Sequence, residues 1–254
     1  MKIIAVIPAR FASTRLPGKP LLSETGRPLI QHVVEAARRA KSLHRIIVAT
    51  DDPRIADVVA GFGGEPMMTR ADHATGTDRV AEVAARIEQA GIIVNVQGDE
   101  PGIAGSTIDR LVSLLESDRD APMATLATPI RDPAVYRDPS CVKVVCSRRD
   151  RALYFSRSPI PHYRDGVPQT SSGSGPLAYL HLGLYAYRRE FLLNLSSLPP
   201  SGLEAAETLE QLRVLEAGFP IAIGIVDEPS IGVDTPEDYR RFVERWRANH
   251  NALA

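Results

Sequence analysis

The sequence of 254 residues lacks the features of membrane-spanning, secreted and disulfide-stabilised proteins. No uninterrupted apolar stretch approaches the roughly 20 residues that cross a bilayer, and the apolar run after the opening Met-Lys is too short for a signal peptide. The only two cysteines, Cys141 and Cys146, stand at odd and even positions of a strand-like run. They would face opposite sides of a strand and cannot form a disulfide. We therefore expect a cytoplasmic protein with no membrane partner.

An excess of charge of either sign is also missing. The 30 Lys and Arg residues nearly balance the 31 Asp and Glu residues, which gives a formal net charge of −1. Such a chain has no general attraction to nucleic acid, so any basic site has to be local. The six histidines are scattered without the spacing of zinc ligands. The first strand is not followed by the Gly-x-Gly-x-x-Gly turn of dinucleotide-dependent dehydrogenases.

The first half of the chain alternates apolar runs with segments of helical spacing. Such runs are typical of strands that are buried on both faces of a parallel sheet. The strands are expected at 3–7, 46–50 and 92–96, and the helices at 29–37, from 53, at 80–87 and from 106. This order predicts an α/β fold with a doubly wound, mostly parallel, Rossmann-like sheet. Residues 1–120 and 218–254 are expected to form its nucleotide-binding body.

The pattern changes after Ala121, where short strand-like segments are separated by turns. We predict an inserted, partly antiparallel β-region at 121–217. Its strands are expected at 123–130, 142–146, 152–156 and 182–187, before a helix at 204–217. The low-complexity segment 164–176 is expected to be a mobile loop. A strand at 221–226 and a helix from Pro236 would return the chain to the body.

A basic loop leaves the carboxyl end of the first expected strand at Pro8. Ligands bind at such strand ends in open α/β sheets, and a group of cations and hydroxyls there suits a polyphosphate. A merely solvated loop is the alternative, but it would not need the stiff Pro17 and the small Gly18 between the cations. The candidate phosphate ligands are Arg10, Ser13, Arg15 and Lys19.

Two carboxylates follow other segments that should reach the same sheet edge. Asp99 ends the third parallel strand, where a simple acidic turn is the alternative to a metal ligand. Asp234 precedes Thr235, and Thr235 with Asp238 resembles a capping box, so Asp234 is not needed as the cap. Carboxylate oxygens suit Mg²⁺, which bridges to phosphate. Asp99 and Asp234 are therefore predicted to hold Mg²⁺ against a triphosphate.

Two further segments carry weaker signals. Residues 70–79 place hydroxyls and a glycine ahead of a helix whose expected N-cap is Thr77, and this loop could offer backbone groups to a nucleobase. Arg157 ends the strand expected at 152–156, although a single cation in such a region is usually solvated.

Eight motifs together resemble the 3-deoxy-manno-octulosonate cytidylyltransferase (CMP-Kdo synthetase) family, nearly end to end. They cover 8–21, 49–52, 68–79, 95–101, 152–157, 181–187, 209–213 and 232–238. The resemblance implies a nucleotidyltransferase fold and transfer of a cytidylyl group from CTP to the anomeric hydroxyl of the acidic sugar Kdo, with release of pyrophosphate. It also implies a need for Mg²⁺, a part in lipopolysaccharide biosynthesis, and a homodimer, with the acceptor site and the dimer contacts in the inserted region 121–217.

The resemblance assigns roles residue by residue. The triphosphate would be held by Arg10, Ser13, Arg15 and Lys19, of which Arg15 and Lys19 would act in catalysis with the metal ligands Asp99 and Asp234. The nucleoside or the acceptor would be surrounded by Thr75, Gly76 and Gln97. The sugar site would be lined by Arg157, His181, Tyr185, Glu210 and Gln211.

Departures from the family pattern fall in the acceptor half, at Leu180, Gly202 and Ala205. CTP is therefore expected as the nucleotide, in preference to UTP, while the acceptor could be Kdo, an amino-Kdo analogue or a smaller acid such as a phosphonate. Two competing functions stay open on the same fold, a sugar-1-phosphate nucleotidyltransferase and a non-catalytic nucleotide-binding module.

Overall fold

The computed structural model describes residues 1–12, 16–168, 175–227 and 232–251. Ser13, Arg15 and residues 169–174 of the low-complexity segment lie outside the described residues. Contacts divide the chain into one unit of residues 1–109 with 230–254 and a second unit of residues 110–229. These bounds differ from the expected 1–120 with 218–254 and 121–217, because the last strand pairs with a strand of the second unit.

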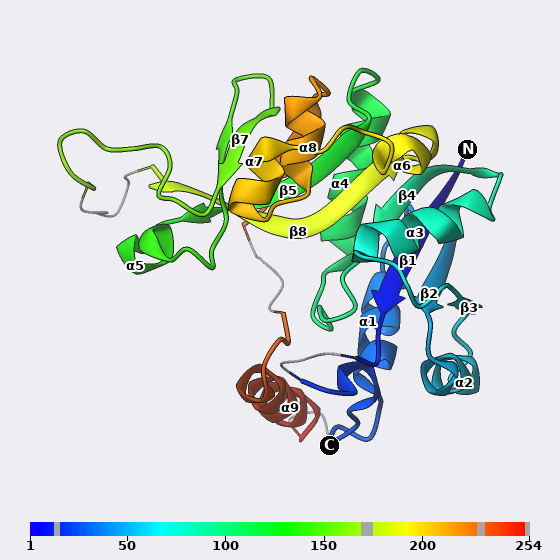
Figure 1. Ribbon diagram of the computed structural model, residues 1–254. Helices are drawn as coiled ribbons and strands as arrows, with labels where there is room; N and C mark the ends of the chain where they lie inside the picture. Colours follow the sequence, from blue (N-terminus) through cyan, green and yellow to red (C-terminus); the bar gives the residue numbers. More distant parts are fainter. Residues whose placement is uncertain (13–15, 169–174, 228–231, 252–254) are drawn as a thin grey trace. The chain divides into compact units, whose positions relative to one another are not determined.

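The first unit contains four parallel strands in the order β3-β2-β1-β4 (Figure 1). They are β1 (Lys2–Ala9), β2 (Arg45–Thr50), β3 (Pro66–Met68) and β4 (Ala90–Asn95). The apolar runs predicted β1, β2 and β4, whereas β3 is too short to show a pattern. The chain winds outward from β1 to β3 and then returns to β4 on the other side of β1. The order of strands thus reverses at β1, and the ends of β1 and β4 flank this switch point.

Some helices of the first unit begin at residues whose side chains cap them, namely Asp52, Thr75 and Thr235. The helices of this unit are the 3-10 helix η1 (Lys19–Leu21), α1 (Leu29–Ala37), α2 (Pro53–Gly61), α3 (Gly76–Ala85), α4 (Gly105–Ser117), which continues into the second unit, and α9 (Pro236–Asn251). The prediction of Thr77 as the N-cap of α3 is wrong. Thr75 is the cap, because its hydroxyl accepts from the Asp78 amide while the Asp78 carboxylate accepts from the Thr75 amide.

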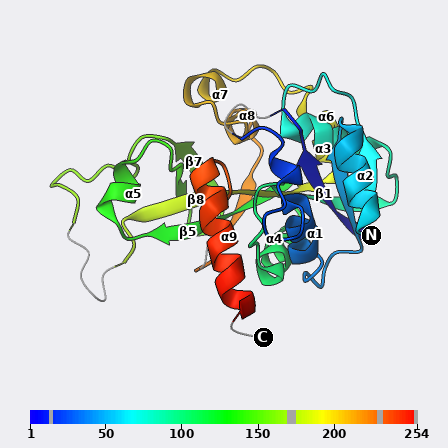
Figure 2. The same cartoon turned by 90° about the horizontal axis from the view of Figure 1, so that it is seen from below.

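The last helix, α9, packs against α1 through an apolar cluster that includes Leu29, Tyr239 and Val243. The ring of His32 on α1 lies edge-on to Trp246 of α9, at 4.4 Å between centroids. The helix is seen along its length in Figure 2. Its packing fixes the segment before Pro236, which carries Asp234, on the first unit.

The second unit has the partly antiparallel sheet that the sequence predicts. Its strands are β5 (Met123–Ile130), β6 (Lys143–Cys146), β7 (Ala152–Ser156), β8 (Ala178–Arg188) and β9 (Ile221–Ile225). Strand β5 runs antiparallel to β8, alongside it in Figure 2, and parallel to β9, while β6 is antiparallel to β7 and β8. Short helices complete the unit, α5 (Pro133–Arg137), α6 (Arg189–Leu195), α7 (Gly202–Glu207) and α8 (Gln211–Glu216).

The helix expected over 204–217 is wrong, because the chain breaks it into α7 and α8. Thr208 ends α7 in the left-handed region, with φ of 54°. A threonine rarely adopts this conformation, so the sequence contains no signal for the break.

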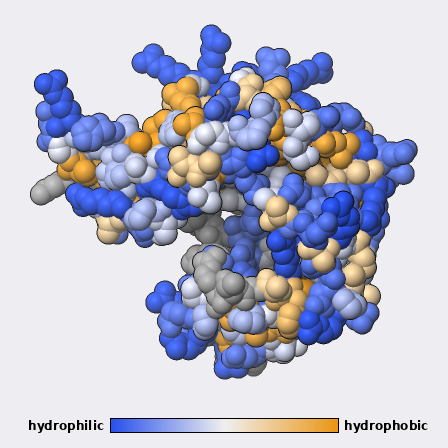
Figure 3. All heavy atoms as spheres, viewed as in Figure 1, coloured by the Kyte–Doolittle hydropathy of each residue, from blue (hydrophilic) through white to orange (hydrophobic). Residues whose placement is uncertain are grey.

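The face of the protein drawn in Figure 3 is mostly polar, with apolar residues scattered over it. Of the described large apolar side chains, Leu153 is the most exposed after Met1, at 61%. The described helices include none with the length and apolar character needed to cross a bilayer.

Candidate functional site

A cavity of about 400 Å³ lies in the first unit at the switch point. It is lined by residues from the ends of β1 and β4, from η1 and from the start of α3. They are Pro8, Ala9, Arg10, Ala12, Lys19, Pro20, Gly76, Gln97, Gly98 and Asp99. Residues that the sequence assigned to nucleotide or metal binding, from Arg10 near the amino terminus to Asp99, are thus brought together at one sheet edge.

Lys19 lies between the two predicted metal ligands. Its Nζ is 2.9 Å from Oδ2 of Asp99 and 3.2 Å from Oδ1 of Asp234. The Lys19 side chain is 15% exposed, against 28% for Asp99 and 44% for Asp234. Two carboxylates therefore converge on one cation beside the cavity, at the sheet edge where the sequence predicts Asp99 and Asp234 to meet.

The turn before Lys19 depends on Gly18. Its φ of 66° lies in the left-handed region, and a Cβ there would be 3.3 Å from the Phe11 ring. The Gly18 amide donates to the Phe11 carbonyl at 3.1 Å, which closes the loop. Glycine adopts this conformation without the strain that a side chain would add, so it sets the direction in which the chain enters η1 with Lys19.

Backbone contacts hold the two carboxylate loops together. The Val233 amide donates to the Asp99 carbonyl at 2.8 Å. After it, Thr235 and Asp238 form the predicted capping box, in which the Asp238 carboxylate accepts from the Thr235 amide at 2.9 Å. The hydrogen bond to Asp99 and the cap of α9 therefore place Asp234 beside Asp99 without using its own carboxylate as the cap.

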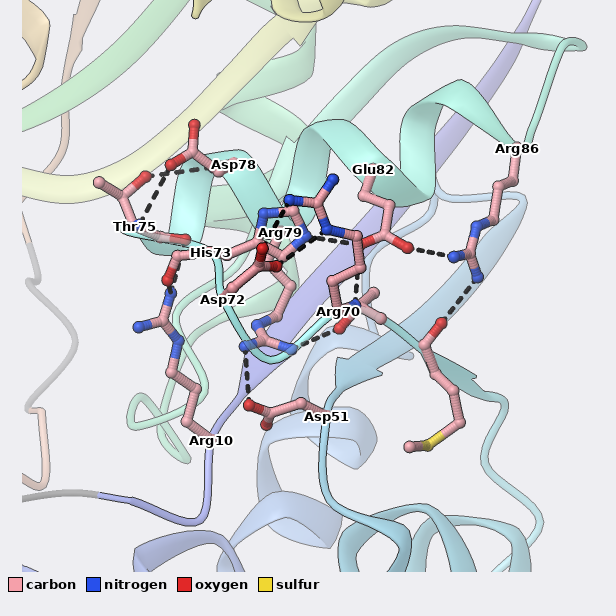
Figure 4. A network of polar contacts seen from close by, with 12 residues as sticks. Arg10, Asp51, Arg70, Asp72, His73, Thr75, Asp78, Arg79, Glu82 and Arg86 are labelled. Carbon is pink, nitrogen blue, oxygen red and sulfur yellow. Dashed lines mark hydrogen bonds and ion pairs between the residues drawn. The ribbon is translucent and has the colours of Figure 1, made fainter.

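Arg10 reaches the loop before α3 (Figure 4). Its Nη2 donates to the carbonyl oxygens of His73, at 3.0 Å, and of Thr75, at 2.7 Å. Among the described residues no carboxylate pairs with the Arg10 guanidinium. The Thr75 side chain caps α3, and Gly76 and Gln97 line the cavity.

In the second unit, the predicted sugar residues His181 and Tyr185 lie on β8 with their rings 5.4 Å apart. The His181 ring also meets Phe155 edge-on at 4.8 Å, and its Nε2 is 3.0 Å from the Thr125 hydroxyl. Burial lowers the pKa of His181 to about 3 and raises the pKa of Tyr185 well above its ordinary value. Both side chains are therefore neutral at pH 7, and His181 offers a hydrogen bond but no positive charge.

Arg157 is anchored to its own unit by backbone carbonyls. Its Nε donates to the Glu207 carbonyl at 2.8 Å, and its Nη1 donates to the Pro139 carbonyl at 3.2 Å. The Glu207 carboxylate accepts from the Arg157 amide at 2.9 Å. Fully buried Lys143 donates to the Arg157 carbonyl at 2.5 Å, and burial lowers its pKa. The guanidinium thus has a fixed position at the end of β7.

The two remaining sugar residues lie at the start of α8. Glu210 directly precedes the helix. Burial is the main cause of the raised pKa of Tyr185, followed by Tyr187 and then by the charge of Glu210. Gln211 is 3% exposed, and its Nε2 is buried without a hydrogen-bond partner in the described part of the chain. A buried amide of this kind is costly unless another group accepts its hydrogen bond, which favours a ligand contact.

The departures from the family pattern have little bearing on the charge of the acceptor. Leu180 packs against an apolar cluster of Ile130, Tyr136, Leu177 and Ala178, on the opposite face of β8 from His181. Gly202 is the first residue of α7, where a Cβ would meet nothing within 4 Å and proline is well tolerated. Ala205 lies in the same helix.

Groups of three or more His, Cys, Asp or Glu residues that could hold a metal are absent from the described part of the chain. The two carboxylates beside Lys19 still fit Mg²⁺, because this ion usually binds one or two carboxylates and completes its coordination shell with water and substrate phosphates. Asp99 and Asp234 are the residues that would hold it.

Sequence patterns did not reveal most of the side chains that hold these residues in place. The Glu82 carboxylate contacts the His73 ring, and the Glu207 carboxylate accepts from the Arg157 amide. The Lys143 ammonium donates hydrogen bonds to three backbone carbonyls. A signal existed for Glu82, since Arg79, Glu82 and Arg86 share one face of a helix.

The site agrees with what this chain is similar to. A family model described as cytidylyltransferase matches residues 4–225. A 3-deoxy-manno-octulosonate cytidylyltransferase from Syntrophotalea carbinolica is 56% identical over 249 residues, which cover 97% of this chain and 99% of the relative. The chain belongs to this family. A relative of the same name from Leptospira biflexa is 50% identical and covers 97% of both chains.

Solved structures of the family and of more distant proteins share the fold. The structure of CMP:2-keto-3-deoxy-manno-octonic acid synthetase complexed with CTP is 44% identical, with a TM-score of 0.90 over 98% of this chain and 100% of that one. A cytidylyltransferase from Leptospira borgpetersenii, at 19% identity and a TM-score of 0.62, shows the likeness of the fold alone. The family resemblance and the α/β fold that the sequence predicted are confirmed.

Proposed function

We propose that this protein transfers the cytidylyl group of CTP to the anomeric hydroxyl of 3-deoxy-manno-octulosonate (Kdo) and releases pyrophosphate. The observation that carries the proposal is the meeting of Lys19, Asp99 and Asp234 beside a cavity at the switch point. The family relatives bear the name of this reaction, and one solved relative is complexed with CTP.

The reaction needs positioning and charge more than covalent chemistry from the protein. The anomeric oxygen forms a bond to the α-phosphorus, the bond from that phosphorus to the bridging oxygen breaks, and the hydroxyl proton goes to solvent. Arg10 and Lys19 would hold the triphosphate in line with the acceptor, and their charges would offset the charge that develops on the leaving pyrophosphate. Ser13 and Arg15 belong to the same proposal from the resemblance.

Mg²⁺ dependence is part of the proposal. Held by Asp99 and Asp234, the ion would supply neutralisation of phosphate charge. Lys19 would then exchange its carboxylate partners for phosphate oxygens, since its ammonium occupies the point where the two carboxylates converge.

The acceptor side would bind a sugar that carries one carboxylate. Neutral His181 and Tyr185, with Glu210 and Gln211, would contact hydroxyl groups, and the fixed guanidinium of Arg157 is the group proposed to meet the carboxylate. Because Leu180 packs into an apolar cluster, it gives no reason to prefer a smaller acid over Kdo. Homodimer formation, a cytoplasmic location and a part in lipopolysaccharide biosynthesis are proposed from the resemblance.

Pyrophosphate release with each of the four nucleoside triphosphates tests the proposal, against a panel of Kdo, amino-Kdo, small phosphonates and hexose 1-phosphates in Mg²⁺. We expect pyrophosphate release only from the combination of CTP and Kdo. Release with CTP and a different acid would change the proposed acceptor and leave the proposed cytidylyl transfer standing. Release with a hexose 1-phosphate would indicate a sugar-1-phosphate nucleotidyltransferase, and CTP binding without release on any acceptor would indicate a binding module.

A further inference from the structure

Glu82 holds the loop at 69–75 from its position on α3. Its Oε2 accepts from the Arg70 amide at 3.0 Å and lies 2.5 Å from Nε2 of His73, while Oε1 accepts from Arg86. The side chains of Glu82 and His73 are only 15% and 10% exposed. Figure 4 shows the Glu82 carboxylate directed toward this loop. One carboxylate therefore fixes the loop near its start and near its end.

Burial would raise the pKa of Glu82, but the hydrogen bonds from the Arg70 amide and from His73, with the charge of Arg86, lower it overall. Glu82 is thus ionised at neutral pH and accepts these bonds as an anion, which makes them stronger than bonds between neutral groups.

The loop in turn anchors Arg10. The two carbonyls that accept from Arg10 Nη2 belong to His73 and Thr75. Arg10 lines the cavity, and its charge has no carboxylate partner among the described residues. The chain of contacts runs from Glu82 through His73 and the loop backbone to the guanidinium of Arg10.

We propose that Glu82 is a positioning residue for nucleotide binding, which acts through His73 and Arg10 without touching the nucleotide. This inference rests on the proposed function, because it takes CTP as the ligand of the cavity. Without Glu82 the His73 ring and the Arg70 amide lose their acceptor, and the carbonyls that orient Arg10 are no longer held. A displacement of about 1 Å at a binding group can cost up to about a hundredfold.

Calorimetric titration of CTP with Mg²⁺, without any acceptor, measures the effect directly. Glu82→Ala is expected to raise the Kd for CTP about tenfold, the size of one lost charge-assisted hydrogen bond. Glu82→Gln keeps an oxygen for the Arg70 amide and should lose less, which provides a second variant if the alanine variant does not fold. Asp72→Asn is the matched control, because Asp72 lies on the same loop and its exposed carboxylate accepts hydrogen bonds from the exposed Arg70 side chain. The Kd of Asp72→Asn for CTP should stay within about twofold of the wild-type value.

A double-mutant cycle separates positioning from general stability. If Glu82 acts through Arg10, adding Glu82→Ala or Glu82→Gln to Arg10→Ala should leave the Kd of the single Arg10 variant unchanged. The inference would be overturned if the Glu82 change raised the Kd for CTP by the same factor in the Arg10→Ala background as in the wild type. It would also be overturned if both Glu82 variants bound CTP with wild-type affinity. The acceptor plays no part in this titration, so a wrong acceptor leaves the result standing. Failure of the wild type to bind CTP would overturn the proposed function and this inference together.

Discussion

Replacement of Gly98 by alanine should disturb both the fold and the site. Gly98 follows the end of β4 and directly precedes Asp99. A Cβ on Gly98 would lie 2.6 Å from the carbonyl oxygen of Pro8 on β1, whereas ordinary contacts begin at 3.4 Å. The difference, 3.4 − 2.6 = 0.8 Å, has to be taken up by backbone, because the atom it meets is not part of a flexible side chain.

The expected loss of stability is about 1–3 kcal/mol, the usual result of overpacking. The expected loss of kcat/KM with CTP is larger than stability alone would give. A shift of this size moves either Asp99 or the strand end that leads to Arg10, and a misplacement of about 1 Å at a reacting centre can cost up to about a hundredfold.

Urea unfolding and steady-state pyrophosphate release measure the two effects on the same preparations. Gly102→Ala is the matched control, since Gly102 is exposed in the same loop and its Cβ would meet nothing within 4 Å. It should unfold and turn over like the wild type. Wild-type stability and kcat/KM in Gly98→Ala would refute the close approach of the two strand ends.

Three other predictions concern the titration of a histidine, a loop anchor and the choice of base. Because the pKa of His181 is about 3 in the folded protein and about 6.5 when unfolded, only the unfolded chain gains a proton as the pH falls below 6.5. The free energy of unfolding should therefore fall toward pH 5 by up to about 2 kcal/mol more in the wild type than in His181→Gln. If urea unfolding shows the same decrease for both proteins, His181 is not buried in its neutral form. Asp109 accepts from the amides of Lys41 and Ser42 at 3.1 and 2.8 Å, so Asp109→Asn should lower the free energy of unfolding by about 1–3 kcal/mol while the exposed Asp57→Asn does not, and equal unfolding midpoints would rule out the anchor. CTP should be used with a higher kcat/KM than UTP, because a pocket fitted to the cytosine amine leaves buried groups unpaired on uracil, and equal values in competition assays would exclude such a pocket.

The sequence predicted the parts of the fold that depend on local patterns. Apolar runs located β1, β2 and β4, and the spacing of Thr235 and Asp238 located the start of α9. Ligands bind at the strand ends of open sheets, and this rule predicted that Lys19, Asp99 and Asp234 lie close together. Lys19 and Asp234 are 215 residues apart in the sequence.

Features that depend on tertiary contacts could not be read from the sequence. Strand β3 is defined only by its pairing with β2, and Thr208 adopts its left-handed conformation without a glycine or proline nearby. The anchoring of Arg157 by Glu207 joins residues 50 positions apart with no pattern that links them. The neutral state of His181 likewise follows from burial between rings of different strands, which composition and spacing do not reveal.

The most direct test of the proposed reaction is the rate of pyrophosphate release from CTP and Kdo in Mg²⁺, measured side by side for the wild type, Asp99→Ala and Asp234→Ala. Each variant removes one of the two carboxylates that converge on Lys19. We predict turnover by the wild type and background rates for both variants, whose thermal unfolding stays close to that of the wild type because both carboxylates are partly exposed. Turnover at the wild-type rate by either variant would contradict the assignment of Asp99 and Asp234 to the reacting centre.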